Sequence, residues 1–306
     1  MADGQTCELR LSERIMPQSA PESTTRQALI EELHGFAAEM RRKIFRTICL
    51  GGGGHLPACF SIVEILAVLY RQILRVNPAD PKNPDRDHFI LSKGHAAVAL
   101  YTILAEMGFI DGALLDTYGH SGTILGGHPD MHKLSGVEAS TGALGHGFPF
   151  GTGIALAGKL DRKSYRTFVV LGDGECQEGS VWEAAMFAAQ QRLDNLMAII
   201  DYNKLQALDQ LNSIVSLEPL ADKWRSFGWS VCEVDGQDIA ALLDAFGRIP
   251  FEPGKPNLVV AHTTKGKGIS FMENVPIWHY RLPSPEEMKA ACRDLGMKEL
   301  TIGKRE

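Results

Sequence analysis

The sequence TFVVLGDGE, residues Thr167–Glu175, decides the fold because it joins an apolar run directly to a carboxylate flanked by glycines. A second apolar run, Leu196–Ile200 (LMAII), leads in the same way into Asp201–Leu205 (DYNKL). Continuous apolar runs of this length are typical of strands in a parallel sheet that is buried on both faces. Because the carboxyl ends of adjacent parallel strands lie at one edge of the sheet, Asp173 and Asn203 are expected close together.

The rest of the chain alternates between strand-like and helical segments. Further strands are predicted at His88–Leu91, Ser230–Val234 and Leu258–His262, with helices at about 95–108, 147–160, 179–192, 216–227 and 238–248. This alternation predicts an α/β fold with a doubly wound, mostly parallel sheet and helices on both faces. Residues 1–22 are interpreted as a loose N-terminal arm and residues 23–306 as a single domain.

The segment before the first strand is predicted to form two helices. Apolar residues at three- and four-residue spacing predict a long amphipathic helix from Ser23 to the glycine run at 51–54. Ser61 is expected to cap a second helix through Ile73, with Glu64 completing a capping box.

Composition excludes several classes of protein. The chain of 306 residues carries a net charge of −6, which disfavours nonspecific binding to nucleic acid. Its six cysteines are scattered without a CxxC pair, so neither a zinc site nor a disulfide framework is expected. No apolar run reaches the roughly 18 residues of a membrane helix, and the first 25 residues lack the apolar core of a signal peptide. We therefore expect a cytoplasmic protein that contacts neither membrane nor nucleic acid.

The residues at the ends of these two strands, Asp173 and Asn203, are candidates for binding a metal ion. A carboxylate and an amide oxygen are ligands that Mg²⁺ accepts, and Gly172 and Gly174 let the backbone approach a diphosphate closely. A Gly-Asp-Gly tripeptide alone is more often an ordinary turn, but the pairing of Asp173 with Asn203 at two strand ends favours a metal–diphosphate site. Seven of the ten histidines fall between residues 55 and 146, in a stretch rich in glycine, which suggests a pocket lined by loops.

These motifs resemble those of the thiamine-diphosphate (ThDP) enzymes, and of transketolases in particular. The resemblance rests on LSKGHA (91–96), GHPD (127–130), STGALGHG (140–147) and GDGECQEGSVWEAA (172–185), in that order. The stretches SLEPLADKWRSFGW (216–229) and TTKGKGIS (263–270) resemble the separately encoded amino-terminal transketolase subunit. The resemblance covers about residues 25 to 290.

The resemblance implies a function and a set of site residues. It implies transfer of a two-carbon ketol unit from a ketose or ketose phosphate to an aldose, with ThDP as the electron sink. Mg²⁺ would be held by Asp173, Asn203 and the carbonyl of Leu205. The cofactor would be contacted by His95, Gly142, Leu144, Gly174, Asn203 and His279, with Glu183 at the subunit interface. The catalytic histidines would be His55 facing the donor, His128 meeting sugar hydroxyls, and His279 near both diphosphate and substrate.

The resemblance also implies a partner. ThDP is activated with the help of a glutamate from a pyrimidine-binding domain, and no such domain is recognisable here. We therefore expect a separate C-terminal subunit to supply that glutamate, in a heterotetramer with sites at the interfaces.

The chain departs from the family pattern at several positions: Leu56–Cys59 after His55, Ala143, His146, Lys204 and Gln237. None of these removes a metal ligand, but the changes beside His55 and at Gln237 leave the identity of the sugar open.

Three other functions compete with this one. The near P-loop at 153–160 lacks the Ser or Thr that binds Mg²⁺ and sits within a helical pattern, which argues against a nucleotide-binding protein. Another ThDP activity (deoxyxylulose-phosphate synthase or 2-oxo acid dehydrogenase E1) shares the GDG–Asn core but fits LSKGHA and GHPD less well. A non-catalytic subunit would be free to lose Asp173, Asn203 and His95, which are intact. A specialised sugar or secondary-metabolite pathway remains open beside central pentose metabolism.

Overall fold

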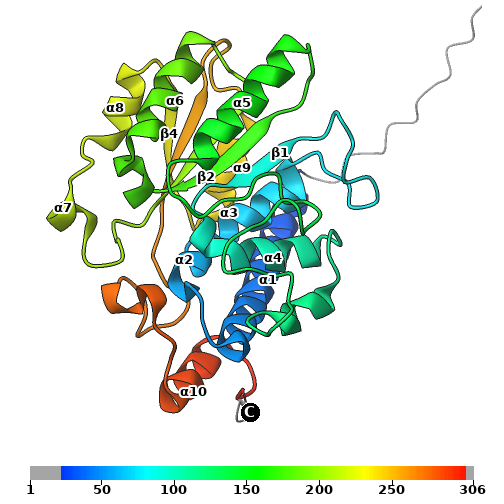
Figure 1. Cartoon of the computed structure of the whole chain (residues 1–306), viewed down its shortest axis with the longest axis vertical. Coiled ribbons are helices and arrows are strands. Elements are labelled where there is room, and N and C mark those ends of the chain that lie inside the picture. The colour runs from blue at the N-terminus through cyan, green and yellow to red at the C-terminus, as the bar shows by residue number, and fades with distance from the viewer. Residues whose placement is uncertain (1–21, 301–306) are drawn as a thin grey trace, which may run out of the picture.

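The computed structural model describes residues 22–300, so residues 1–21 of the expected arm and residues 301–306 lie outside the described part. Five parallel strands form one sheet in the order β1-β2-β3-β5-β4 (Figure 1). The strands are β1 (His88–Leu91), β2 (Thr167–Gly172), β3 (Leu196–Tyr202), β4 (Ser230–Asp235) and β5 (Asn257–His262). All five predicted strands are confirmed, and the sheet is parallel throughout.

The apolar runs are strands because both of their faces are buried. Phe168 and Val170 of β2 pack into the core shared with helices α1, α3, α4 and α9. Val169 and Leu171 of the same strand point the other way, into the core shared with α5, α6 and α8. Alternate side chains thus fill two separate cores, as a three-layer fold requires.

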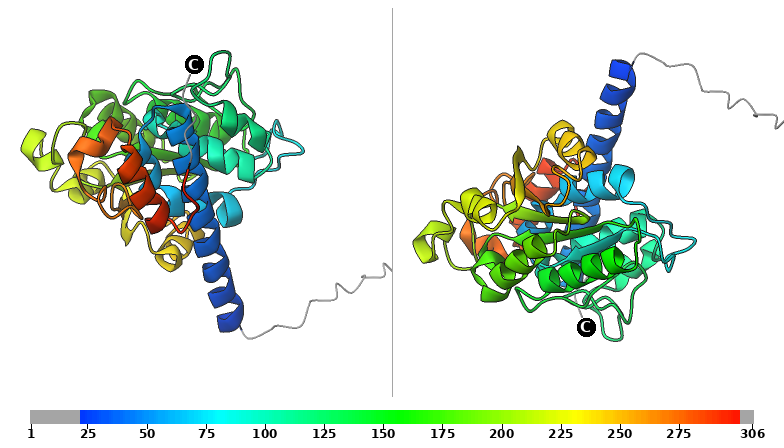
Figure 2. Two further views of the ribbon diagram at one scale, coloured as in Figure 1. Left: turned by 90° about the horizontal axis from the view of Figure 1, so that it is seen from below. Right: turned by 90° about the horizontal axis from the view of Figure 1, so that it is seen from above.

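Helices cover both faces of the sheet (Figures 1 and 2). One layer contains α5 (Gly147–Leu160), α6 (Gly179–Gln190) and α8 (Leu220–Ser226), with the short α7 (Leu211–Ile214) beside it. The other contains α1 (Glu22–Gly51), α2 (Leu56–Phe60), α3 (Val63–Val68), α4 (Ala97–Glu106) and α9 (Ile239–Gly247). The helix α10 (Pro285–Asp294), which the sequence analysis did not predict, packs onto this second layer.

Short 3-10 helices occupy several of the loops. They are η2 (Gly94–Ala96), η3 (Gly112–Thr117), η4 (Gly174–Gln177) and η5 (Pro276–Tyr280), whereas η1 (Leu69–Ile73) is a π-helical turn that continues α3. None of the helices within residues 22–300 is both long and apolar enough to cross a membrane.

The predicted capping box at Ser61 and Glu64 is wrong. The segment forms two helices, α2 and α3, and the residue that precedes α3 is Ile62, which makes no side-chain cap. The Ser61 hydroxyl instead donates to a carboxylate oxygen of Asp201, 2.7 Å away, and Glu64 pairs with Arg41 at 2.7 Å. Both side chains are buried, so long-range partners take the groups that a local cap would have used.

Candidate functional site

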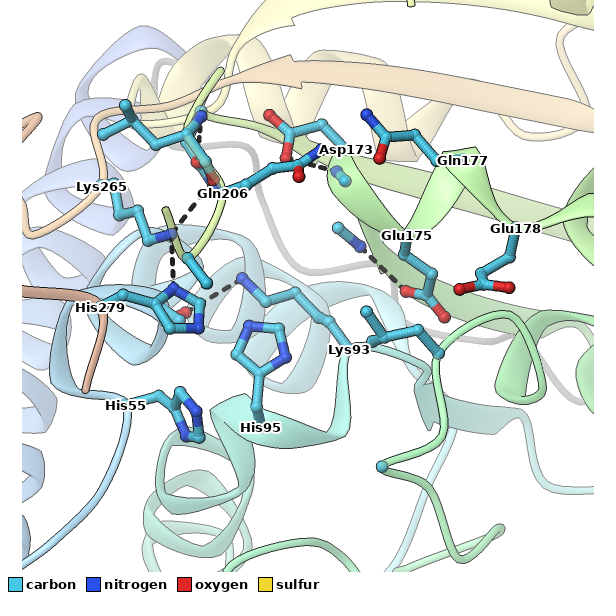
Figure 3. A pocket seen from close by; sticks show the side chains of 18 residues that line it. His55, Lys93, His95, Asp173, Glu175, Gln177, Glu178, Gln206, Lys265 and His279 are labelled. Carbon is cyan, nitrogen blue, oxygen red and sulfur yellow. Dashed lines mark hydrogen bonds between the residues drawn. The ribbon is translucent and has the colours of Figure 1, made fainter. Parts of the chain in front are cut away.

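A cavity of about 400 Å³ opens at the carboxyl ends of the strands. Four neighbouring strands deliver a polar residue to it: Lys93 follows β1, Asp173 follows β2, Asn203 follows β3 and Lys265 follows β5. All the predicted site residues line this cavity except His128 and Glu183; those that do are His55, His95, Gly142, Leu144, Asp173, Gly174, Asn203, Leu205 and His279. Figure 3 shows the three histidines together on one side and the acidic residues Asp173, Glu175 and Glu178 across from them.

Asp173 is the buried carboxylate at the centre of the loop after β2. Its side chain is 2% exposed and accepts hydrogen bonds from the backbone N–H groups of Gly174 (2.7 Å) and Lys204 (2.5 Å). Burial, together with the nearby charge of Asp201, raises the pKa of Asp173 to about 6. Burial removes this carboxylate from water and disfavours its charged form, and a bound cation would restore the lost stabilisation.

The loop after β3 brings two more oxygen atoms beside Asp173 that could hold a cation, the amide oxygen of Asn203 and the carbonyl oxygen of Leu205. The side-chain nitrogen of Asn203 donates to Asp201 at 3.1 Å, which fixes the orientation of its amide, and the amide oxygen accepts from the backbone of Leu205 at 3.1 Å. Lys204, between them, has φ of +64°, a left-handed conformation that glycine adopts more easily. Its backbone N–H is thereby aimed at Asp173.

Two buried lysines belong to the site, and the sequence analysis did not single them out. Lys93 pairs with the fully buried Asp201 and donates to the carbonyl of Ala58 at 3.1 Å. Burial by itself would raise the pKa of Asp201, but the charge of Lys93 and hydrogen bonds from Lys93, Thr263 and Ser61 lower it. Asp201 therefore stays ionised and holds Asn203 in place.

Lys265 links the loop after β3 to His279. Its ammonium donates to the carbonyl of Leu205 at 3.1 Å and lies 3.0 Å from Nδ1 of His279. An ammonium can only donate, so Nδ1 of His279 accepts and its proton resides on Nε2. Burial and the charge of Lys93 lower the pKa of Lys265 to about 8. The sequence signal for both lysines was a basic residue within three positions of the end of an apolar strand.

Glu175 ties together the loops around the cavity. Its carboxylate accepts from the Ser92 hydroxyl, from the backbone of Gly145 at 3.0 Å and from the backbone of Gly172 at 3.1 Å. Burial raises its pKa, while these hydrogen bonds act in the opposite direction. Three segments thus meet at the carboxylate of Glu175: the segment after β1, the end of β2 and the loop before α5.

The histidines form a cluster of neutral imidazoles. The ring centre of His55 is 5.1 Å from that of His95 and 5.1 Å from that of His279. Burial, followed by neighbouring positive groups, lowers the pKa of His55 to about 4 and that of His279 to about 3, and that of His95 well below its usual value. At neutral pH each ring therefore has one donor and one acceptor nitrogen, as proton transfer requires.

His128 and Glu183 lie away from the cavity lining. His128 is exposed, its ring centre 6.5 Å from that of His55, and a Cβ atom on Gly142 would come within 2.9 Å of its ring. Glu183 is exposed on α6. Tyr280, which the sequence analysis did not single out, is 64% exposed with its ring 4.7 Å from that of His55. His128 and Tyr280 therefore flank His55.

The departures from the family pattern have local structural roles. Leu56–Cys59 form most of the buried α2, whose Ala58 carbonyl binds Lys93. Gln237 donates to the carbonyl of Thr264 at 3.2 Å, next to Lys265, and does not line the cavity. The His146 ring lies 3.1 Å from the carbonyl of Leu144. Ala143 is exposed.

The residues present fit a hard divalent cation and a polyanion. Within residues 22–300 no group of three His, Cys, Asp or Glu side chains forms a metal site, so a transition-metal centre built from such ligands is not present there. Asp173, Asn203 and Leu205 instead offer a carboxylate, an amide and a carbonyl oxygen, the ligand types that Mg²⁺ takes alongside phosphate oxygens. Two buried lysines on the same cavity suit the phosphates.

Comparison with known proteins identifies relatives over most of the chain. The family described as "Transketolase, thiamine diphosphate binding domain" matches residues 38–302. The chain is 46% identical to one subunit of the apulose-4-phosphate transketolase of Actinobacillus succinogenes over 270 residues, which covers 87% of this chain and 96% of that protein. It is 43% identical to the 6-deoxy-6-sulfo-D-fructose transketolase subunit SqwG of a Clostridium species over 244 residues, covering 80% of this chain and 89% of that one.

The fold agrees with these relationships. The crystal structure of transketolase from Campylobacter jejuni superposes with a TM-score of 0.83 and 27% identity over 88% of this chain. The match covers 43% of that longer chain.

Proposed function

The chain belongs to the transketolase family, and from that premise we propose that it is the diphosphate-binding subunit of a split, Mg²⁺-dependent transketolase. The observation that carries the proposal is the convergence of Asp173, Asn203 and the Leu205 carbonyl beside two buried lysines and three neutral histidines. When bound, ThDP would supply the electron sink for cleavage of the bond between two carbons of a ketose.

The cation and the diphosphate would be held by the loops after β2 and β3. Asp173, Asn203 and the carbonyl of Leu205 would hold Mg²⁺, with Asp201 orienting Asn203 through its amide nitrogen. Lys265 donates to Leu205 in this structure and lies against His279, so its charge is available to a phosphate on the same side. Gly142, Leu144, Gly174 and His95 would line the rest of the cofactor site.

The histidines would handle protons on the substrate. Ketol transfer removes a proton from a hydroxyl of the donor and needs hydrogen-bond donors where negative charge develops on oxygen. His55 and His279 have lowered pKa values and are neutral at pH 7. His55 can therefore accept a proton at one nitrogen and donate from the other, whereas His279, whose Nδ1 accepts from Lys265, can donate from Nε2 to a substrate oxygen. His128, at the exposed side of His55, would meet the sugar hydroxyls.

A partner subunit would complete the site. The relatives that match along nearly their whole length are each named as one subunit of a transketolase, whereas full transketolases extend far beyond the matched region. We place the pyrimidine-binding domain and its glutamate on that partner, in a cytoplasmic heterotetramer. Exposed Glu183 would lie at the interface, alongside the exposed apolar residues Met186 and Phe187 of the same helix.

The identity of the ketose substrate is a separate part of the proposal. Two of the relatives are named for apulose 4-phosphate and for a sulfonated fructose. In this chain Tyr280 and α2 lie next to His55, where they would border the sugar. A specialised ketose is therefore the second candidate beside a central pentose phosphate.

The proposal is tested by measuring first ThDP binding and then ketol transfer in the complex assembled with the partner subunit. Calorimetry with Mg²⁺ should show ThDP binding that EDTA abolishes, and a panel of pentose, branched and sulfonated ketose donors should reveal transfer to an aldose phosphate. Absence of metal-dependent ThDP binding would contradict the proposal, whereas binding with turnover of only one donor class would identify the sugar.

A further inference from the structure

An exposed tyrosine lies beside the cavity, on the side of the histidines. The side chain of Tyr280 is 64% exposed, and its ring centre is 4.7 Å from that of His55, with the two rings tilted by 56°. His55 lines the cavity and Tyr280 does not, so the tyrosine ring lies just outside it. Isolated exposed aromatic residues are common on protein surfaces, so exposure alone points to no function, whereas contact with a proposed catalytic imidazole does.

The turn that carries Tyr280 is anchored on both sides of it. Trp278 is 4% exposed, and the guanidinium of Arg281 lies 4.2 Å from the centre of the Trp278 ring. Arg281 also pairs with Glu287 of α10 at 2.8 Å. His279, directly before Tyr280, lies 3.0 Å from the buried lysine of the loop after β5. The Tyr280 ring is therefore presented by a fixed backbone, although most of its own surface is open to water.

The hydroxyl of Tyr280 lies against the loop before His55. A Cβ atom on Gly53 would come within 3.3 Å of the hydroxyl oxygen, so the lack of a side chain at Gly53 leaves room for it. Because the hydroxyl faces this loop and His55 lies beside the ring, the remaining surface of the ring is open to a ligand. An aromatic surface of this kind packs against the C–H groups of a sugar carbon chain.

The proposed function indicates which ligand would reach this ring. The diphosphate and its cation would lie beside Asp173, and His55 and His279 lie across the cavity from that residue (Figure 3). The two carbons that are transferred would therefore meet the histidines. The rest of the ketose would extend past His55 to the exposed side, where Tyr280 lies.

We propose that the ring of Tyr280 packs against the part of the ketose beyond the two transferred carbons, and that Tyr280 thereby selects among sugars. The same surface would receive the acceptor aldose, because the reaction is reversible and the released aldose of one direction is the acceptor of the other. Tyr280 moves no proton in this role. This inference rests on the proposed function and deepens it by naming a residue that determines which sugar fits.

Two donors of different length test this contact in the complex assembled with the partner chain. Hydroxypyruvate carries only a carboxylate beyond the two transferred carbons, whereas a ketose phosphate carries a chain of hydroxylated carbons. Tyr280→Ala should lower kcat/KM about tenfold for the ketose phosphate that the donor panel identifies, and less than about twofold for hydroxypyruvate. Tyr280→Phe keeps the ring and should therefore retain the kcat/KM values of the unmodified complex for both donors.

Binding of the sugar can also be measured without turnover. With ThDP and Mg²⁺ present and no donor, calorimetry should show that Tyr280→Ala weakens binding of the acceptor aldose phosphate used in the transfer assay by about tenfold. ThDP affinity and the ligand-free melting temperature should stay unchanged, because the ring is exposed and contributes little to the core.

Ile277→Ala is the matched control. Ile277 belongs to the same short helix, η5, and is 67% exposed. In this variant the ratio of the kcat/KM values for the two donors should equal that of the unmodified complex. Titration with labelled partner chain measures assembly of both variants, and Tyr280→Ala should assemble as the unmodified chain does.

Several results would overturn the inference. An unchanged ratio of the two kcat/KM values in Tyr280→Ala would refute it and leave the proposed function standing. Equal losses for both donors would make Tyr280 a support for His55 instead, and weaker assembly at an unchanged ratio would make it an interface residue. A loss in Tyr280→Phe as large as in Tyr280→Ala would assign the contact to the hydroxyl and contradict packing by the ring. If the unmodified complex transferred no ketol unit from any ketose, the proposed function and the inference would fail together.

Discussion

Replacing Lys93 with methionine should destabilise the protein strongly, because it leaves the carboxylate of Asp201 buried without its counter-charge. Lys93 is 1% exposed and Asp201 is fully buried. Removing one partner of such a pair typically costs about 3–5 kcal/mol. For a chain of this size that corresponds to a fall in melting temperature of roughly 10 °C.

The effect should depend on pH in a direction set by Asp201. In the unmodified protein the pKa of Asp201 is lowered. The Lys93–Asp201 ion pair therefore stabilises the fold at pH values above the unfolded-state pKa of about 4. This stabilisation is lost as the pH falls through the folded-state pKa of Asp201. Without Lys93, burial dominates and raises that pKa, so the variant loses stability as pH rises from about 4 towards 7. The stability difference between the two proteins should therefore be larger at pH 7 than at pH 5.

Urea unfolding at both pH values measures this difference. Lys163→Met is the control, because Lys163 pairs with Asp85 on the exposed surface and should change little. The double variant Lys93→Met/Asp201→Asn should recover part of the lost stability, since no charge is left buried. Equal stability of Lys93→Met and the unmodified protein at pH 7 would refute this account of the pair.

Three further predictions follow from the site. Asp173→Ala should abolish Mg²⁺-dependent ThDP binding in calorimetry, because the diphosphate loses its cation; unchanged affinity would exclude Asp173 as a ligand. His55→Ala should lower kcat by about 10²- to 10⁴-fold with nearly intact ThDP affinity, and a change below about threefold would argue against direct proton transfer. Lys204→Gly should be more stable than Lys204→Val by about 1–2 kcal/mol in thermal unfolding, since only glycine adopts the left-handed conformation freely; equal stabilities would contradict that origin.

The strands and the meeting of Asp173 with Asn203 were predictable from the sequence because their signals are local. Each apolar run is buried on both faces, and Asp173 and Asn203 stand at the ends of adjacent strands. The helix α10 could also have been found, since Ser284 and Glu287 form a true capping box at its start. Ser61 and Glu64 have the same spacing but bond to distant side chains, which a local pattern cannot reveal.

The side-chain network that supports Asp173 and Asn203 could be found only from the tertiary structure. Lys93 and Asp201 are separated by 108 residues, and they meet because β1 and β3 flank β2. The role of Lys265 likewise depends on η5 folding back to place His279 beside it. Whether Glu183 contacts the cofactor depends on a partner chain, so that assignment stays a prediction.

The central claim is that this chain is one half of an enzyme, and reconstitution tests it most directly. ThDP-dependent ketol transfer from hydroxypyruvate or a ketose phosphate should be measured for this chain, for the chain encoded beside it, and for their mixture. We predict no turnover from either chain alone and activity that appears on mixing, with saturation at one copy of each. Full activity from this chain alone, in a preparation shown by mass spectrometry to contain no copurified partner, would contradict the claim.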